Sequence, residues 1–227
     1  MNANIKADGQ AESGSNTGDG IGPEIMDATL AILEATGFKP DWVYLDAGLS
    51  AIEKGKDPMP QGTIDAVREI GVALKGPTTT PSGTGHVSAN VRLRKALDLY
   101  ANVRPAKTLP GIKGPFAHMD VDIISDLCAG LVGGLGLAPG ANIGKECAVF
   151  EAVHGSAPDI AGKGIANPTA LLLSSLLMLR YLGHTEQADT VKDSVLRICS
   201  EGKCLTKDLG GNANTDEYRQ EVISLAS

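Results

Sequence analysis

From Gly18 onward, segments with helical periodicity alternate with short apolar segments, and this alternation constrains the fold more than any other feature of the chain. Glycine and proline mark the ends of several of these segments. The order predicts an α/β domain in which helices cover both faces of a mostly parallel sheet. Helices are expected at 23–36, 63–70, 91–99, from near Asp122 to the Gly133-Gly134 pair, after the N-cap Asn167, at 185–200 and from Thr215, with strands at 42–45, 72–74 and 148–150.

The first 17 residues differ from the rest, because they are small and polar and have no aromatic side chain and no regular period. Such a segment buries too little apolar surface to offset the entropy of ordering it. We therefore expect a disordered tail at 1–17 and a single domain at 18–227, since 227 residues with 42% hydrophobic side chains suffice for one core.

Charge and cysteine usage exclude several classes of protein. The net charge is −7 with no basic block, which argues against nucleic acid and anionic membranes as partners. The longest apolar stretch, 170–179, is far shorter than the roughly 20 residues of a membrane span. Four cysteines without a CxxC pair favour reduced thiols in a cytosol-like compartment.

Two loop motifs lie in the first third of the chain. GDGIGPE at 18–24 is a glycine-rich turn before a helix, which binds anions in some proteins but is more often purely structural; it is not a GxGxxG motif. KGPTTTP at 75–81 follows an apolar strand and places hydroxyl groups at the carboxyl end of that strand, where α/β sheets bind ligands.

Three further motifs carry charged side chains. In SANVRLRKALDLYANVRP at 88–105, Arg94 and Arg104 bracket a helix and can both donate to carboxylates. Asp122 and Asp126 have the i, i+4 spacing that would place two metal-binding carboxylates on one helix face, although such a pair is more often a helix N-terminal feature. FEAVHGSAPDIAGKGIANPTA at 150–170 forms a long loop with His154 and Asp159.

Together and in this order, these five segments resemble the isocitrate/isopropylmalate dehydrogenase family, and the resemblance extends from Gly18 to Leu225. It implies the α/β fold of that family's large domain, which is not a classical Rossmann fold. In the family, loops such as the one after Phe150 bind the cofactor, so the lack of GxGxxG does not count against membership.

The resemblance implies isocitrate as the substrate, because isocitrate-type members are similar to this chain in carrying serine and asparagine at the positions of Ser88 and Asn90. Arg94 and Arg104 would then bind substrate carboxylates. The implied reaction is that of the tricarboxylic acid cycle, NAD-dependent oxidative decarboxylation to 2-oxoglutarate, with Mg²⁺ or Mn²⁺ bound by Asp122 and Asp126.

The resemblance also assigns the cofactor site. An acid at Asp159, beside Ile160, is typical of members that use NAD, because it accepts hydrogen bonds from ribose hydroxyls and repels a 2′-phosphate. Thr79 and Glu151 would face the nicotinamide. The adenosine pocket would be lined by His154, Gly155, Ala157 and Asn167.

The chain departs from the family pattern between Gly114 and Asp122, where only seven residues replace a long segment. We expect a deletion near 114–122 that removes the small domain. By the resemblance, the deletion would also remove the tyrosine and lysine that transfer protons in the family, a third arginine that binds the substrate, and most dimer contacts. It would also remove a metal-binding aspartate that the partner subunit contributes. The nearest residues that could replace this tyrosine and lysine are Tyr100 and Lys107.

The N-terminus departs from the family pattern as well. Family members have an apolar strand directly before GDGIGPE, and we expect that strand to be missing here.

Several alternatives stay open at this point. The chain is expected to be a cytoplasmic or mitochondrial-matrix protein, from a family of homo-oligomers, whose catalytic residues are unknown. It could instead be a binding-only homologue akin to regulatory subunits, or act on isopropylmalate or homoisocitrate. A structural fragment that associates through apolar residues of 123–137 is a further reading.

Overall fold

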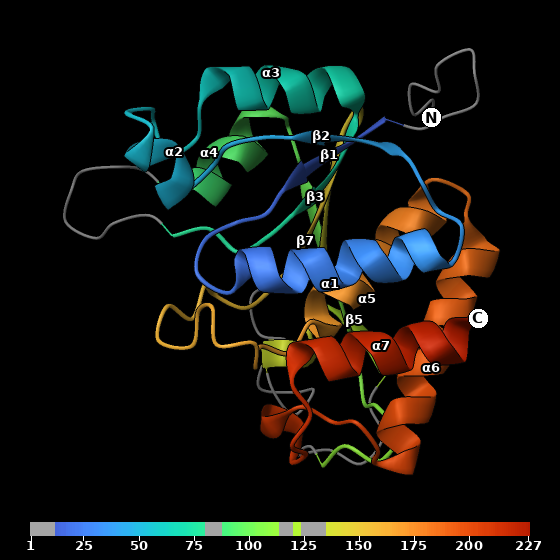
Figure 1. Ribbon diagram of the computed structural model, residues 1–227. Coiled ribbons are helices and arrows are strands. Elements are labelled where there is room, and N and C mark those ends of the chain that lie inside the picture. Colours follow the sequence, from blue (N-terminus) through green and yellow to red (C-terminus); the bar gives the residue numbers. More distant parts are fainter. Residues whose placement is uncertain (1–11, 80–87, 114–119, 124–134) are drawn as a thin grey trace.

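The computed structural model describes residues 12–79, 88–113, 120–123 and 135–227, with the backbone alone described at 12–16, 121–123 and 135. A seven-stranded sheet runs through the molecule with helices on both faces (Figure 1). The strands are β1 (Glu12–Asn16), β2 (Asp41–Tyr44), β3 (Val72–Lys75), β4 (Ala101–Lys107), β5 (Asp120–Ile123), β6 (Pro139–Ile143) and β7 (Ala148–Ala152). The helices are α1 (Gly22–Ala35), α2 (Leu49–Glu53), α3 (Gln61–Ile70), α4 (Ala89–Ala96), α5 (Thr169–Tyr181), α6 (Thr185–Glu201) and α7 (Thr215–Ala226).

The sheet has the strand order β2-β1-β3-β7-β6-β4-β5 and is mixed. The pairs β2–β1, β1–β3 and β3–β7 are parallel, whereas β7–β6, β6–β4 and β4–β5 are antiparallel. The α/β class with helices on both faces is confirmed, and the predicted parallel arrangement holds for the half that ends at β7. The other half reverses because a tight turn, closed by the hydrogen bond from Gly144 N to Cys147 O, joins β6 to β7 as a hairpin.

Two cores lie on opposite faces of the sheet because consecutive strand residues point to opposite sides. Val72 and Leu74 of β3 belong to the larger core, which α1, α5, α6 and α7 cover. Ala73 between them belongs to the smaller core, which α3 and α4 cover. Helix α5 is buried along most of its length, in keeping with its continuous apolar sequence.

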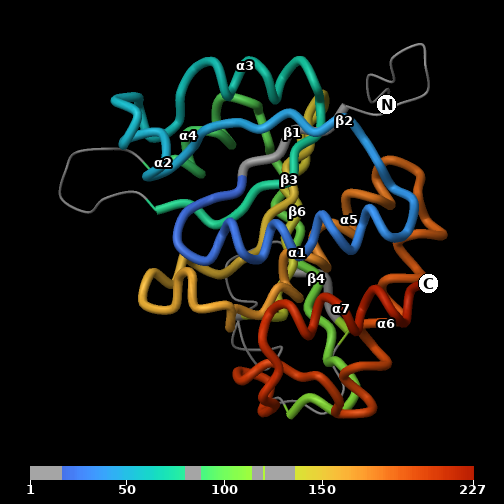
Figure 2. The backbone as a smooth tube through the Cα atoms, in the orientation of Figure 1, coloured from blue at the N-terminus to red at the C-terminus, as the bar shows by residue number. Residues whose placement is uncertain are grey.

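The helices expected from periodicity are confirmed as α1, α3, α4, α5, α6 and α7, each within a few residues of the expected bounds. Helix α6 ends at Gly202, which adopts a left-handed conformation (φ 67°). Helix α7 begins with a capping box formed by Asn214 and Glu217. Helices α1 and α7 lie side by side (Figure 2), so two segments far apart in the sequence close the same core.

The expectation that 1–17 is a tail and that the first strand is missing is wrong for Glu12–Asn16, which form β1. This strand lies between β2 and β3 and pairs with both in parallel. Gly14, for example, is opposite Val43 on one side and Ala73 on the other. The polar composition concealed the strand, because backbone hydrogen bonds from two neighbours stabilise it whatever its side chains are. Residues 1–11 lie outside the described residues.

The helix expected to start near Asp122 is also corrected, because residues 120–123 form the edge strand β5. Strand β5 pairs with β4 in antiparallel register, with Asp122 opposite Pro105. Residues 124–134, which include Asp126, lie outside the described residues.

Two further expectations concern the cysteines and membranes. Three of the four cysteines lie in the described part of the chain, and Cys147, Cys199 and Cys204 are all free thiols. Among the described residues, no helix has the length and apolar character that crossing a bilayer requires.

Candidate active site

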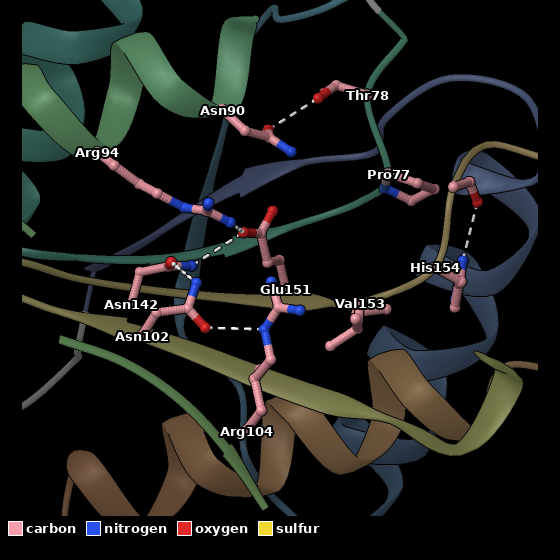
Figure 3. A pocket seen from close by; sticks show the side chains of 13 residues that line it. Pro77, Thr78, Asn90, Arg94, Asn102, Arg104, Asn142, Glu151, Val153 and His154 are labelled. Carbon is pink, nitrogen blue, oxygen red and sulfur yellow. Dashed lines mark hydrogen bonds and ion pairs between the residues drawn. The ribbon is translucent and has the colours of Figure 1, made fainter. Parts of the chain in front are cut away.

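A cavity of about 210 Å³ lies where β4, β6 and β7 meet the start of α4 and the loop after β3. Most of the side chains that line it are polar or charged (Figure 3). It is lined by Pro77, Thr78, Asn90, Arg94, Asn102, Arg104, Gly140, Asn142, Glu151, Ala152, Val153, His154 and Gly155.

Glu151 is the central anionic group of this cavity. It lies on the buried strand β7, and its two carboxylate oxygens contact different cations: Oε2 is 2.8 Å from Lys75 Nζ, and Oε1 is 2.7 Å from Arg94 Nη2. Burial by itself would raise the pKa of Glu151, but the charges of Lys75 and Arg94 and their hydrogen bonds outweigh it and lower the pKa to about 2. Glu151 is therefore a carboxylate at any physiological pH.

Arg94 points into the cavity from α4. Its Nη2 donates to Glu151, while its Nε is buried and has no hydrogen-bond partner. Such a donor is costly to leave unsatisfied in a folded protein. Because Arg94 lines the cavity, an oxygen of a bound anion would supply the missing acceptor.

Arg104 reaches the same cavity from β4, so the two guanidinium groups enter it from different elements (Figure 3). Its Nε donates to Asn102 Oδ1 at 2.8 Å. Asn90, on the first turn of α4, also faces the cavity and accepts a hydrogen bond of 2.9 Å from the hydroxyl of Thr78. Two cations and an amide therefore surround a space that suits a small molecule with several carboxylates.

A second cavity, of about 650 Å³, adjoins the first. His154 and Gly155 line both, so the two cavities share a wall. Burial lowers the pKa of His154, whose Nε2 is buried without a partner. Both isoleucine and polar side chains line this second cavity. Its lining residues are Ile21, Gly136, His154, Gly155, Ala157, Ile160, Ile165, Asn167, Lys207 and Asp208.

The GDGIGPE turn holds the loops around these cavities in place. Asp19 accepts hydrogen bonds from the backbone N–H groups of Leu49, Ser50 and Thr79. Gly20 has a positive φ of 61°, and a Cβ atom there would lie 1.9 Å from Ser156 O. In the described structure the turn therefore has the structural role that a glycine-rich turn usually has, and it packs against the loop after β7 that carries His154 and Gly155.

Glu24, the last residue of the same motif, fastens a second pair of loops. It accepts hydrogen bonds from Gly164 N at 3.1 Å and Ala166 N at 2.9 Å, and from the hydroxyl of Thr215. Helix α1 is thereby connected to the segment before α5 and to the start of α7.

The structure gathers most of the residues that the family resemblance singled out. Asn90, Arg94 and Arg104 line the first cavity together with Glu151, and His154, Gly155, Ala157, Ile160 and Asn167 line the second. Three residues lie elsewhere. Ser88 and Asp159 are exposed and line neither cavity, and the hydroxyl of Thr79 contacts Ser156 Oγ at 2.5 Å.

The two candidates for the absent proton-transfer groups do not line the first cavity. Tyr100 is 70% exposed. Lys107 is exposed and pairs with Asp120 at 2.6 Å. Neither side chain therefore lies in the cavity, where a proton-transfer group would have to be within hydrogen-bond reach of a bound molecule.

The predicted metal pair is not assembled by the described residues. Asp122 lies on a strand, so the helical spacing that was to pair it with Asp126 does not apply there, and Asp126 is outside the described residues. Within the part of the chain that the structure describes, no group of three or more His, Cys, Asp or Glu side chains could hold a metal ion.

Lys75, Asn102 and Asn142 are site residues that sequence reasoning missed. Asn102 could have been found, because it is two residues from Arg104 on the same strand and must share its face. The other two could not, since they meet Glu151 only through the pairing of β3 and β6 with β7.

An α/β sheet with a cation-lined cavity beside a larger, partly apolar cavity defines a class of protein that binds a small anion next to a bigger ligand. The comparisons with known proteins give the family. The chain belongs to the isocitrate/isopropylmalate dehydrogenase family of oxidoreductases, whose sequence profile matches residues 15–120 and 116–222. The two matched stretches meet at 116–120, within the segment where the sequence suggests a deletion.

Two curated relatives illustrate the range of activities in the family. The chain is 32% identical to a mitochondrial regulatory subunit of isocitrate dehydrogenase [NAD] from Dictyostelium discoideum, over 91% of this chain and 89% of the relative. It is also 32% identical to isocitrate dehydrogenase [NADP] of Thermus thermophilus, over 91% of this chain and 66% of the relative. The first alignment extends over 323 positions, so it contains positions at which this 227-residue chain has no residue.

Among solved structures, isocitrate dehydrogenase from Methylococcus capsulatus matches with a TM-score of 0.90 at 29% identity. The match covers 96% of this chain and 99% of that one. The predicted family and its fold are therefore confirmed.

Proposed function

We propose that this chain binds isocitrate in the first cavity and NAD in the second, as an NAD-dependent isocitrate dehydrogenase-type protein. The observation that carries the proposal is the buried, unpartnered Nε of Arg94 in a cavity that Arg104 and Asn90 also line. An isocitrate carboxylate would accept from that N–H, and a second carboxylate would accept from Arg104. The polar Asn90 favours isocitrate over isopropylmalate, which is apolar at the corresponding end.

The second cavity suits a dinucleotide in chemistry. Ile21, Ile160 and Ile165 would contact the faces of an adenine ring, and the buried Nε2 of His154 would gain a hydrogen-bond partner. When bound, NAD accepts the hydride from the substrate. Asp159 supports NAD over NADP only through the family resemblance, because it does not line the cavity.

The metal enters the proposal only through the family resemblance. The resemblance assigns Mg²⁺ or Mn²⁺ to Asp122 and Asp126, but the described residues do not form such a site by themselves. The proposed function therefore includes no catalytic step through a metal.

Two candidate functions are compatible with these cavities, an active dehydrogenase and a binding-only homologue. An active dehydrogenase needs groups that move protons, and neither Tyr100 nor Lys107 is placed to do so. A binding-only homologue needs only the two cavities, and a regulatory subunit is among the relatives at 32% identity. Homo-oligomer formation and a cytoplasmic or mitochondrial location are carried over from the family as proposals.

Absorbance of NADH at saturating isocitrate, NAD and Mn²⁺ separates the two candidates. Turnover that depends on isocitrate would establish the dehydrogenase, and a parallel run with EDTA shows whether that turnover needs the metal. No turnover together with calorimetric binding of both ligands would establish the binding-only homologue. A folded chain that binds neither isocitrate nor NAD would contradict the proposal as a whole, and parallel runs with isopropylmalate and NADP decide between the related ligands.

A further inference from the structure

We propose that Asn102 and Asn142, which form an amide relay between Arg104 and Glu151, are positioning residues that make the two arginines of the first cavity act as a coupled pair. The proposal deepens the proposed function, since it concerns the same site. It rests on a chain of hydrogen bonds that crosses three strands, β4, β6 and β7.

The relay has a single direction. Arg104 Nε donates to Asn102 Oδ1 at 2.8 Å, Asn102 Nδ2 donates to Asn142 Oδ1 at 2.9 Å, and Asn142 Nδ2 donates to Glu151 Oε1 at 2.9 Å (Figure 3). A guanidinium can only donate and a carboxylate can only accept. The charged ends therefore fix the orientation of both amides, and neither amide can flip without losing bonds at both of its ends.

The hydrogen bonds of the relay are buried, which increases their strength. Asn142 is only 2% exposed, and its Nδ2 also contacts Val149 O at 3.3 Å. Glu151 and Arg104 are also buried. Hydrogen bonds that involve a charged partner in such surroundings are stronger than those in water and are costly to leave unmade.

The far end of the relay reaches the second arginine. The oxygen that accepts from Asn142, Glu151 Oε1, also accepts from Arg94 Nη2 at 2.7 Å. The positions of Arg104 and Arg94 are thus connected through one carboxylate and two amides. An anion that moves one guanidinium changes the hydrogen bonding of the other, so the two arginines bind their carboxylates cooperatively.

A double-mutant cycle tests the coupling, because the Asn142 amide bonds to Asn102 and Glu151 rather than to either guanidinium. Isocitrate binding is measured by calorimetry for the native chain, Asn142→Leu, Arg104→Gln and the double variant. We expect Asn142→Leu to weaken binding roughly tenfold and to reduce the loss caused by Arg104→Gln by at least about threefold. Additive losses would overturn the proposal, because a merely structural asparagine affects binding independently of Arg104.

A second measurement needs no ligand. The ¹H–¹⁵N resonance of Arg104 Nε–H is assigned by its disappearance in Arg104→Lys. It should shift in Asn142→Leu, two hydrogen bonds away, and stay in place in Asn212→Leu, which changes an exposed asparagine. An unchanged resonance in Asn142→Leu would contradict the relay.

The two measurements keep the inference separate from the proposed function. If the native chain fails to bind isocitrate but the Arg104 resonance shifts, the function is wrong and the relay stands. If isocitrate binds, the cycle is additive and the resonance does not move, the relay is wrong and the function stands. Should Asn142→Leu not fold, Asn102→Leu is used with the Arg94 Nε–H resonance, which lies beyond the other end of the relay.

Discussion

At the scale of single residues, Arg94 gives the most direct test of the substrate site. A lysine keeps the positive charge but cannot present the paired N–H groups of a guanidinium to a carboxylate. Arg94→Lys should therefore weaken isocitrate binding by tenfold or more, about 1.4 kcal/mol, in calorimetric titration. Arg68→Lys is the matched control, because Arg68 is exposed on α3 and pairs with Asp65; equal affinities for the two variants would remove Arg94 from the site.

The ion pairs of Glu151 predict a pH dependence of stability. Its pKa in the fold is about 2, below the ordinary value of 4.5, so the charged form is the one that folding favours. The stabilisation is therefore complete above pH 4.5 and is lost as the pH falls toward 2. Glu151→Gln, which leaves Lys75 buried without a counter-ion, should lower the free energy of unfolding by about 3 kcal/mol at pH 7.

Urea denaturation at pH 7 and pH 3 checks this expectation. The difference between the native chain and Glu151→Gln should shrink at the lower pH, because the carboxyl of the unfolded chain is mostly protonated at pH 3, so Glu151 must release a proton on folding to form its ion pairs. Glu53→Gln changes an exposed glutamate of α2 and should leave both curves unchanged. A difference that is constant with pH would show that the charge of Glu151 does not stabilise the fold.

The candidate residues also show what sequence can and cannot predict at this scale. Arg94 and Arg104 were predicted because they stand in a motif with a characteristic order of residues. Asn142 was not predicted, because its significance lies in a contact with Asn102 forty positions away in the sequence. Asp159 shows the converse: the motif assigned it to the cofactor site, but in the structure it does not line the second cavity.

At the scale of elements, the turn before α1 provides a test of close packing. Gly20 and Gly55 both have a positive φ, 61° and 72° respectively. A Cβ atom at Gly20 would lie 1.9 Å from Ser156 O, whereas a Cβ atom at Gly55 would have no other atom within 4 Å. Gly20→Ala should cost about 3 kcal/mol of stability and Gly55→Ala about 1 kcal/mol, because only the first adds a clash to the backbone strain. Equal melting temperatures for the two variants would contradict the packing of this turn against the 156 loop.

Strand β1 is one of the elements that sequence reasoning missed, and a proline substitution tests it. Ser15 pairs with Tyr44 on one side and Leu74 on the other, so its backbone lies inside the sheet. Ser15→Pro removes an N–H from the ladder and should destabilise the chain by about 3 kcal/mol or more, while Ser15→Ala should change little. If both variants unfold at the same urea concentration, residues 12–16 behave as a tail, as their composition suggested.

The errors in predicting elements share a physical cause. Helices such as α1 and α6 were found because one apolar stripe repeats every 3.6 residues and ends at glycine. Strands β1, β4 and β6 carry small or polar residues, and their stability comes from neighbours that are remote in sequence. A pattern of side chains along the chain contains no information about such neighbours.

At the scale of the whole molecule, the shared wall of the two cavities predicts how ligands affect stability. His154 and Gly155 line both cavities, so either ligand should stabilise the loop after β7. A ligand at 100 times its Kd adds about 2.7 kcal/mol to the free energy of unfolding, which for a chain of this size raises Tm by roughly 5–10 °C. Isocitrate and NAD should each give such a shift in scanning calorimetry, and Arg94→Lys should reduce the shift with isocitrate while preserving the shift with NAD. Loss of both shifts in that variant would mean that the two cavities do not bind their ligands independently. If the native chain melts cooperatively and neither ligand changes its Tm, the chain has kept the fold of its family without its binding sites.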